Sequence, residues 1–371
     1  MKILCITGSF LPDIGGMQFS THQTIMGLVE NGAEVTLICP FTEGSDKFDE
    51  DLAFTVLRSG KGGYFTDLNN MMLANKLFLR DNYEHVIVMG HMCEVSYGVL
   101  SNFLAFKAII LAAGTRLSFH NSWHKVFIRN ILLCRAYKNA LKIITISEQT
   151  ARDISQFTKL EFDRMRKIPR PIDGNIWKPD SNRYIGGNNL FRIVTFSRLE
   201  EQKNIQGVLQ ILSKIDTEKF PFEYKVIGDG EYRDNLVAHA NALNLGKNVE
   251  FLGYKEQDEI SKILSVSDLH ILLSKAHNGL GETFGRVYAE AGFVGVPSIG
   301  YDTPGVREAI SEGISGYLFS FDETDDIKNK IEQLISNRRL LEELSDTTIR
   351  FCNENFEKKI IGAAILDYIN E

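Results

Sequence analysis

Cysteine is scarce and unpatterned in this chain of 371 residues. The five cysteines include no Cys-x-x-Cys pair and no other paired spacing. Zinc sites and disulfide frameworks both need clustered or paired cysteines. The sequence therefore excludes both and predicts reduced thiols in a cytosolic protein, with no metal site. The five are Cys5, Cys39, Cys93, Cys134 and Cys352.

Long apolar runs are also missing. No stretch approaches the roughly 20 apolar residues that span a bilayer. The N-terminus, MKILCITGSF, starts directly with a strand-like run and lacks the apolar core and cleavage site of a signal peptide. We therefore expect a cytoplasmic protein that is soluble or peripheral to a membrane. The chain also shows no repeat of fixed period and no low-complexity tract.

Acidic residues are absent between Glu94 and Glu148, although the net charge of the chain is −7. Such a basic block is either a solvated surface or a contact for an anionic surface or ligand. The block holds Lys107, Arg116, Lys125, Arg129, Arg135, Lys138 and Lys142.

The middle of this block, residues 118–142, places apolar and cationic side chains at spacings of three and four, which puts an apolar stripe beside a cationic one on a helix. One interpretation is a core-packed helix whose polar face is basic. The other is a helix that docks on an anionic leaflet at the inner face of the cytoplasmic membrane. The apolar stripe comprises Trp123, Phe127, Ile131 and Leu132.

Short runs rich in β-branched residues alternate with longer segments of helical spacing, such as 17–31 and 120–140. Nearly continuous apolar strands between helices predict parallel sheets covered on both faces. The pattern stops after residue 147 and restarts at 191, across a Gly-, Asn- and Pro-rich segment, 173–189, that is typical of a linker. We therefore predict an α/β protein with two doubly wound domains, which bind ligands at strand ends and in the cleft between domains. The predicted strands are 2–7, 34–39, 85–90, 107–113, 142–147, 191–197, 223–228, 248–253, 269–274 and 296–301.

Two segments that follow the first strand of a domain suggest phosphate binding. Gly15-Gly16 lets the backbone approach a ligand, and the helix behind it offers free N–H groups and a positive dipole end. Arg198 and Lys203 lie in a loop at the carboxyl end of a strand, where two cations favour an anion such as a diphosphate. The alternatives are a glycine pair in an ordinary turn and two solvated surface charges.

The stretch GETFGRVYAE, residues 281–290, holds two carboxylates eight residues apart. Glu282 precedes a predicted helix start, and Glu290 lies about two turns into the helix, roughly 8–9 Å along its axis. That distance matches the span from a sugar ring to a ribose across a diphosphate, so the hypothesis is one acid for each end of a nucleotide sugar, with helix amides between them. Alternatively, Glu282 is an N-terminal dipole charge and Glu290 a surface acid.

The region GETFGRVYAEAGFVGVPSIGYDTPGVREAISEGISGYLF resembles the E-x7-E signature of the large family 4 of retaining glycosyltransferases, the glycosyl transferases group 1, which have the GT-B fold. The resemblance implies two Rossmann-like domains facing across a cleft: an acceptor-side domain of residues 1–180 plus about 355–371, and a donor-binding domain of residues 181–354. Further segments match the family in order and spacing: FLPDIGGMQ, TISE, FSRLEEQKN, VIGDGEYRDNL, VEFLGY and VSDLHILLS.

The resemblance implies roles for the residues singled out above. Catalysis is assigned to Glu282, Arg198 and Lys203, with the two cations gripping the donor diphosphate and Glu282 binding donor-sugar hydroxyls. Glu290 binds the ribose hydroxyls, and readout of the base uses backbone groups near residues 251–256. Further donor contacts are assigned to Gly16, Thr283, Phe284 and Gly285.

Three positions depart from the family pattern. Ser197 and Asn204 replace glycines, which is a mild change. Ala113 stands where many relatives have a histidine beside the reacting carbon, and alanine cannot donate a hydrogen bond. The histidine's role is therefore absent or moved to another acceptor-side residue, with His91 the first candidate; His91 is otherwise a structural or acceptor-site histidine. The other candidates are Thr115, Arg116 and His120.

The resulting prediction is a retaining, metal-independent hexosyltransferase without a cofactor. It would move a sugar from a nucleoside-diphosphate sugar, with UDP favoured over GDP, to a saccharide or lipid-linked acceptor in the biosynthesis of surface polysaccharide or lipopolysaccharide. The alternatives are another GT-B enzyme of sugar nucleotides, an epimerase or phosphorylase, and a non-catalytic nucleotide-sugar binder. Nucleic acid is not an expected partner, because the second half of the chain is acidic and no recognition motif is present.

Overall fold

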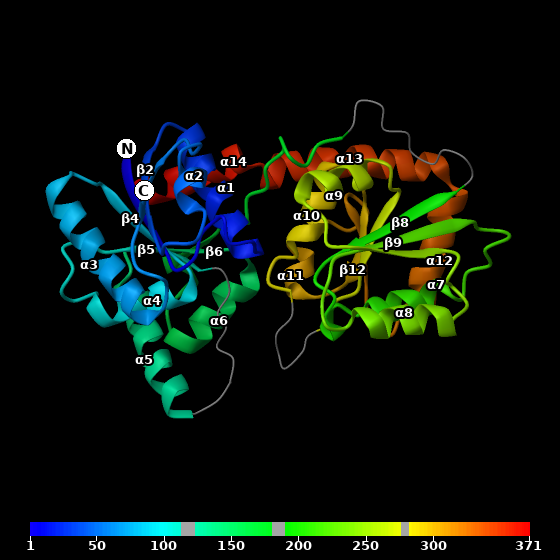
Figure 1. Cartoon of the computed structure of the whole chain (residues 1–371), viewed down its shortest axis with the longest axis horizontal. Coiled ribbons are helices and arrows are strands. Elements are labelled where there is room, and N and C mark those ends of the chain that lie inside the picture. The colour runs from blue at the N-terminus through cyan, green and yellow to red at the C-terminus, as the bar shows by residue number, and fades with distance from the viewer. Residues whose placement is uncertain (113–122, 180–189, 276–281) are drawn as a thin grey trace. The chain divides into compact units, whose positions relative to one another are not determined.

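The computed structural model describes residues 1–112, 123–179, 190–275 and 282–371 (Figure 1). It divides into two compact units, unit 1 with residues 1–171 and 356–371, and unit 2 with residues 172–355. Each unit is a parallel sheet with helices packed against it, so the predicted fold of two doubly wound α/β domains is confirmed.

The sheet of unit 1 has the strand order β3-β2-β1-β4-β5-β6-β7, and all its strand pairs in the described residues are parallel. Along β1, Ile3 and Cys5 face a core cluster with α1 and α14, whereas Leu4 and Ile6 face a second cluster with α3, α4 and α5. Because both faces are covered, the strand is apolar from Ile3 to Ile6. The strands are β1 Lys2–Thr7, β2 Glu34–Cys39, β3 Thr55–Arg58, β4 His85–Met89, β5 Ile109–Ala112, β6 Lys142–Thr145 and β7 Met165–Lys167. The helices are α1 Gly16–Glu30, α2 Ser45–Asp49, α3 Tyr64–Arg80, α4 His91–Leu100, α5 Trp123–Asn139, α6 Glu148–Thr158, the short 3₁₀ helix η1 Phe162–Arg164, and α14 Lys358–Asn370.

Helix α14 packs directly on α1 (Figure 1), so the C-terminal segment belongs to unit 1. The two helices approach closely at Gly27 and Gly362: a Cβ on Gly362 would lie 2.1 Å from the carbonyl oxygen of Gly27. The buried Lys358 pairs with Glu30 at 3.0 Å at the same crossing. A larger residue at either glycine would force the helices apart.

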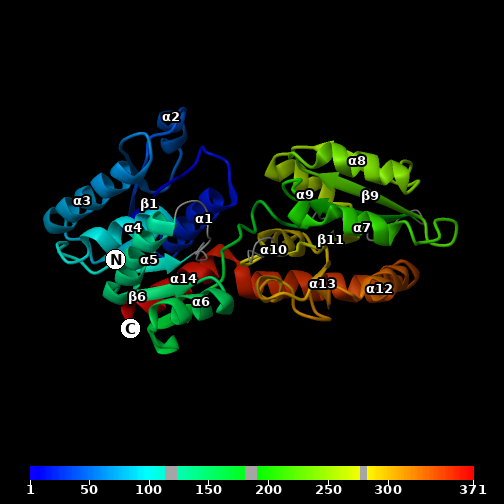
Figure 2. The ribbon, with the colours of Figure 1, turned by 90° about the horizontal axis from the view of Figure 1, so that it is seen from below.

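The sheet of unit 2 has the order β10-β9-β8-β11-β12-β13, with parallel pairs throughout the described residues. Figure 2 labels β9 and β11 of this sheet together with helices of the unit. Along β11, Leu269 and Ile271 join a core cluster with α7, α8 and α12, whereas Leu272 on the opposite face meets α10 and α11. The strands are β8 Phe191–Phe196, β9 Phe222–Ile227, β10 Val249–Gly253, β11 Leu269–Leu272, β12 Ser298–Tyr301 and β13 Gly316–Phe319. The helices are η3 Glu201–Lys203, α7 Ile205–Leu212, α8 Arg233–Ala242, α9 Gln257–Ser265, α10 Arg286–Phe293, α11 Pro304–Arg307, α12 Thr324–Ser336 and α13 Arg338–Phe356.

The described part of the predicted linker, residues 173–179, is packed against unit 2. Trp177 is buried, and its ring stacks on Phe196 at 6.0 Å between centroids. Ser261 donates a hydrogen bond to the carbonyl oxygen of Ile176. The composition of this segment predicted a linker, but the buried Trp177 attaches its described part to unit 2.

Strand order reverses once in each sheet. In unit 1, β1 lies between β2 and β4, and in unit 2, β8 lies between β9 and β11. Ligands of doubly wound sheets bind outside the carboxyl ends of the strands at such a switch point. Ligand-binding residues are therefore expected in the loops after β1 and β4 in unit 1, and in the loops after β8 and β11 in unit 2.

Candidate active site

Lys203, Ser274 and Glu282 meet at the switch point of unit 2. The ammonium of Lys203 lies 2.5 Å from Oε1 of Glu282, and Oγ of Ser274 donates to the same oxygen at 3.0 Å. Lys203 comes from the turn after β8, Ser274 from the segment after β11, and Glu282 from the segment before α10. The Lys203 and Glu282 side chains are each 18% exposed, so the ion pair is shielded but open to a ligand.

The backbone of Glu282 is held by close contact with the start of α11. A Cβ on Gly305 would lie only 1.7 Å from the carbonyl oxygen of Glu282. No side chain larger than hydrogen fits there, so Gly305 allows the loop carrying Glu282 to lie against α11. This glycine belongs to the segment Tyr301-Asp302-Thr303-Pro304-Gly305, to which no site role was assigned from the sequence.

Arg198 occupies a different position from Lys203. Its side chain is exposed, and its Nη1 lies 2.7 Å from Oε1 of Glu200. The loop that carries it is fixed by the loop after β9: the Leu199 amide donates to the carbonyl oxygen of Asp229, and a Cβ on Gly228 would overlap the carbonyl oxygen of Ser197. The backbone is thus rigidly placed, while the guanidinium extends from it into solvent.

Helix α10 starts at Arg286, with Gly285 as its N-cap in the left-handed conformation, φ 67° and ψ 55°. A Cβ there would also meet the ring of Tyr288 at 2.6 Å, so glycine is required on two grounds. Phe284 is buried and Thr283 is exposed. The helix therefore begins directly after the stretch Thr283-Phe284-Gly285, beyond Glu282 as predicted.

Glu290 is buried inside α10 and paired with Arg286 one turn before it. Nε and Nη2 of Arg286 each lie 2.8 Å from Oε1 of Glu290. Burial raises the pKa of Glu290, and the guanidinium of Arg286 opposes that rise. The alternative that Glu290 is a surface acid is therefore wrong.

In unit 1, Gly16 is the first residue of α1, after the loop that follows β1. A Cβ on Gly16 would meet no described atom within 4 Å, whereas a Cβ on Gly15 would meet the side chain of Gln18 at 2.5 Å. No packing contact among the described residues requires a glycine at 16, and at 15 only the flexible end of the Gln18 side chain would have to move.

A cluster of buried acids lies beside His91 at the carboxyl end of the unit 1 sheet. Nδ1 of His91 lies 4.0 Å from Oε2 of Glu94, which accepts a hydrogen bond from the Tyr137 hydroxyl at 2.9 Å. Burial raises the pKa of Glu94 to about 7, against the opposing hydrogen bond from Tyr137. Burial likewise raises the pKa of Asp67 to about 6, against the weak hydrogen bond from the Cys93 thiol.

Several sequence-predicted positions lie outside the described residues. They are Ala113, Thr115, Arg116 and His120. His91 is described, and the structure places it at the start of α4, directly after β4.

Sequence reasoning missed several partners of the candidate site residues. Glu290 was predicted, but its pairing with Arg286 was not, although the i,i+4 spacing of a helical ion pair was a usable signal. Ser274 ends the strand segment LHILLS, yet nothing in the sequence indicates its contact with Glu282. Asp67 and Glu94 lie in segments whose pattern is that of ordinary amphipathic helices. Their burial therefore could not be predicted from the residues next to them in the sequence.

Within residues 1–112, 123–179, 190–275 and 282–371, no group of three or more His, Cys, Asp or Glu side chains could hold a metal ion. All five cysteines lie in the described residues and are free. None of the described helices is both long enough and apolar enough to cross a bilayer.

Solved structures of similar shape show the fold. The crystal structure of HepE from Anabaena in complex with UDP aligns over 100% of both chains with a TM-score of 0.80 at 20% sequence identity. The same protein has also been solved with UDP-glucose, with a TM-score of 0.77. The chain is therefore a two-domain, Rossmann-like protein of the GT-B class.

Sequence comparison defines the family. The model for "Glycosyltransferase Family 4" matches residues 14–175, and the model for "Glycosyl transferases group 1" matches residues 186–351. The chain belongs to the group 1 glycosyltransferases, as the sequence motifs predicted.

Two relatives illustrate the range of this family. N-acetyl-alpha-D-glucosaminyl L-malate synthase of Bacillus anthracis is 30% identical over 169 residues, which is 46% of this chain and 42% of that protein. The match thus spans less than half of that relative. Alpha-monoglucosyldiacylglycerol synthase of Streptococcus pneumoniae is 29% identical over 97% of this chain and 84% of its own length.

Proposed function

We propose that this glycosyltransferase moves a hexose from a nucleoside-diphosphate sugar, with UDP favoured over GDP, to a saccharide or lipid-linked acceptor with retention of anomeric configuration. The observation that carries the proposal is the contact of Lys203 and Ser274 with Glu282 at the switch point of unit 2. A cation, a hydroxyl and a carboxylate from three separate segments converge where doubly wound sheets bind nucleotides. The surrounding residues offer a partner for each part of a nucleotide sugar.

The donor diphosphate is assigned to Arg198 and Lys203. Arg198 extends into solvent from a fixed loop, so its guanidinium can turn from Glu200 to a phosphate at little cost, because an exposed ion pair contributes little. Lys203 can bridge a phosphate oxygen and Glu282, which leaves the second oxygen of Glu282 for donor-sugar hydroxyls. Amides at the start of α10 would add positive potential beside the same phosphate.

The ribose hydroxyls are assigned to Glu290. Its Oε1 is occupied by Arg286, whose guanidinium opposes the rise in the pKa of Glu290 that burial causes. A charged carboxylate accepts hydrogen bonds from both hydroxyls of a ribose more strongly than a protonated one. The preference for UDP is supported by HepE, a protein of the same fold that has been solved with UDP and with UDP-glucose.

Retention is proposed to proceed without a protein nucleophile. The leaving phosphate would take the acceptor's proton on the face where the acceptor attacks. The new glycosidic bond then forms as the bond between sugar and phosphate breaks. The protein's part is to position both substrates and stabilise the departing diphosphate, and Arg198 and Lys203 can do so without a divalent metal.

The acceptor is assigned to unit 1, around His91 and the buried carboxyls of Glu94 and Asp67. A carboxyl whose pKa is raised by burial can, when protonated, donate a hydrogen bond to an acceptor oxygen, and Nδ1 of His91 lies 4.0 Å from Oε2 of Glu94. Thr115 and Arg116 remain proposed acceptor-side residues. A lipid-linked acceptor is supported by the relative whose name describes synthesis of a glucosylated diacylglycerol.

Peripheral contact with an anionic membrane is also proposed, through α5. This helix packs on the core with Leu133, Ala136 and Tyr137, and leaves Phe127 61% and Ile131 51% exposed. The helix is therefore packed on the core, as the first interpretation held, but Phe127 and Ile131 of the predicted apolar stripe lie outside that contact. Helix α3 lies in the same helical layer (Figure 1). It exposes further large apolar residues. These are Phe65, Met72 and Leu79.

The test is incubation of the purified chain with UDP-, GDP- and ADP-sugars, with thermal unfolding and donor hydrolysis as readouts. A UDP-sugar should raise the midpoint most, and hydrolysis should continue in EDTA. Proton NMR of the transferred or released sugar should show the donor's anomeric configuration first. Stabilisation by no nucleotide sugar, or an inverted first product, would contradict the proposal.

A further inference from the structure

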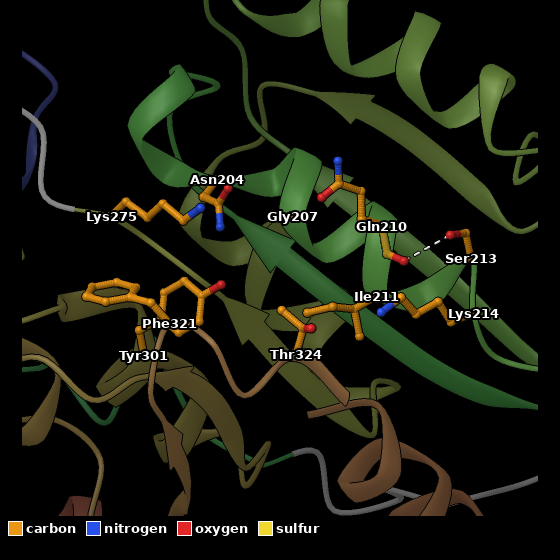
Figure 3. A pocket seen from close by; sticks show the side chains of 10 residues that line it. All are labelled: Asn204, Gly207, Gln210, Ile211, Ser213, Lys214, Lys275, Tyr301, Phe321 and Thr324. Carbon is orange, nitrogen blue, oxygen red and sulfur yellow. Dashed lines mark hydrogen bonds between the residues drawn. The ribbon is translucent and has the colours of Figure 1, made fainter. Parts of the chain in front are cut away.

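Unit 2 contains a cavity on the α7 side of its sheet, of about 360 Å³, that none of the assigned donor residues lines (Figure 3). It is formed by α7, by the ends of β11 and β12, and by the loop leading into α12. Its walls are apolar on two sides, where Ile211 and the half-exposed Phe321 lie. Phe321 packs edge-on against Tyr301, with 4.7 Å between the ring centroids.

A buried amide in the cavity wall lacks a hydrogen-bond partner. Asn204 is only 3% exposed, and its Nδ2 has no partner among the described residues. The side chain lies against α7 because position 207 is glycine: a Cβ there would come within 2.5 Å of Nδ2. A buried unsatisfied donor costs about 1–3 kcal/mol, so its place in a cavity wall indicates a ligand that accepts from it.

Two further donors point to the same end of the cavity. Figure 3 shows the Lys275 ammonium, the Asn204 amide nitrogen and the Tyr301 hydroxyl directed toward one another. No ion pair to Lys275 occurs among the residues that the structure describes. Burial raises the pKa of Tyr301, and a contact between its hydroxyl and the Asn204 side chain, which falls outside hydrogen-bond geometry, opposes that rise. Three donors without a shared acceptor form a site for an oxyanion.

The opposite end of the cavity is polar but already paired. Lys214 lies 2.8 Å from Asp325, and the Ser213 hydroxyl donates to the carbonyl oxygen of Gln210. Together with Thr324, these groups offer both donors and acceptors, as sugar hydroxyls require. A flat apolar wall between two polar ends suits one sugar ring.

We propose that this cavity binds an anionic sugar derivative of one ring, whose phosphate or carboxylate is held by Lys275, Asn204 and Tyr301. The site is separate from the assigned donor residues, but Asn204 directly follows Lys203 and closes the turn of η3. The Lys275 amide also donates to the carbonyl oxygen of Gln202 in that turn. A ligand on these residues would therefore contact the segment that positions Lys203.

The experiment is isothermal titration calorimetry of the full chain with glucose 6-phosphate, glucuronate, inorganic phosphate and glucose. Each titration is repeated in a variant with Arg198→Ala and Lys203→Ala, which removes both cations of the candidate active site. Glucose 6-phosphate or glucuronate should bind in both backgrounds, and the stronger of the two identifies the anionic group. Neutral glucose should bind at least tenfold more weakly.

Two substitutions locate the binding. Lys275→Met should weaken it about tenfold or more, and Tyr301→Phe, which removes one hydroxyl and keeps the ring, by a smaller factor. Lys247→Met is the matched control, an exposed lysine of unit 2 outside the cavity lining. The proposal is overturned if neither sugar anion binds, if binding is lost with Arg198 and Lys203, or if Lys275→Met and Tyr301→Phe both leave affinity unchanged. Equal affinity for inorganic phosphate and glucose 6-phosphate would overturn the assignment of a sugar ring.

Discussion

Arg286 and Glu290 lie one turn apart on α10, and their side chains meet at 2.8 Å in a position where both are almost completely buried. Removing one partner of a buried pair leaves an uncompensated charge, which costs about 3–5 kcal/mol. Arg286→Met should therefore lower the free energy of unfolding by several kcal/mol at neutral pH and raise the pKa of Glu290 further. The double variant Arg286→Met with Glu290→Gln should recover much of the loss in urea unfolding. Additive losses would show that the pair is not coupled.

Lys203 should matter for turnover more than for folding. Lys203→Ala removes the cation from Glu282 and, in the proposed function, a charge-assisted hydrogen bond to the donor diphosphate that contributes about 1.5–3 kcal/mol. Each 1.36 kcal/mol is tenfold in rate, so turnover should fall on the order of 10-fold to 100-fold or more. Lys219→Ala, at an exposed lysine of the same unit, is the control. Wild-type turnover in a folded Lys203→Ala protein would contradict the assignment of Lys203 to the active site.

Substitution by alanine should lower stability at Gly305 but not at Gly16. A Cβ on Gly305 would lie 1.7 Å from the carbonyl oxygen of Glu282, so Gly305→Ala should destabilise unit 2 by about 1–3 kcal/mol and displace Glu282. A Cβ on Gly16 meets no described atom within 4 Å, so Gly16→Ala should leave thermal unfolding unchanged. If Gly16 faces the donor phosphate, that variant should still raise KM for the donor. Gly16→Ala with unchanged KM would contradict that assignment.

Stability should depend on pH through Glu94. Its pKa is raised to about 7 in the folded protein, so the native state holds a proton that the unfolded chain releases at the ordinary pKa near 4.5. Between these values the native state binds more protons, and the free energy of unfolding should fall as pH rises from about 4.5 to 7. Glu94→Gln, which keeps an acceptor for the Tyr137 hydroxyl, should flatten this slope. An unchanged slope, measured by urea unfolding across this range, would show that Glu94 titrates normally.

Membrane contact through α5 should require both its apolar and its basic side chains. The fraction of protein that cosediments with liposomes should increase as the anionic lipid content rises, and it should fall with added salt. Changing Lys125, Arg129 and Lys138 to Glu should abolish it, and Phe127→Ser with Ile131→Ser should weaken it strongly. Ile314→Ser, at an exposed apolar residue of unit 2, is the matched control. If the protein does not bind strongly anionic vesicles at low salt, membrane contact is contradicted and the basic block is a solvated surface.

The central strands of both sheets were predictable because burial on both faces leaves an unbroken apolar run. β1 and β2 were located to the residue, whereas β3, β7 and β13 were missed. All three missed strands are sheet edges in the described order, with only three or four residues each. An edge strand is paired on one side only and stays partly exposed, so its sequence lacks the apolar run that marks a central strand.

The positions of the candidate site residues were predictable only in part. The carboxyl ends of β8 and β11 follow from the alternation of strands and helices, and they place Lys203 and Ser274 at one edge. The direct ion pair between Lys203 and Glu282 depends on side-chain directions across 79 residues of chain, which no local pattern encodes. The burial of Glu290 depends in the same way on the packing of α10 against its sheet.

The docking of α14 on α1 makes unit 2 an insertion within unit 1. During synthesis, all of residues 172–355 leave the ribosome before the helix that covers α1 exists. Domains fold as units when their residues become available, so unit 2 can complete its core while one face of the unit 1 sheet still lacks its cover. Unit 1 can therefore complete its fold only after unit 2 has been synthesised. Until α14 is made, Ile25 and Leu28 of α1 lack the α14 residues against which they pack.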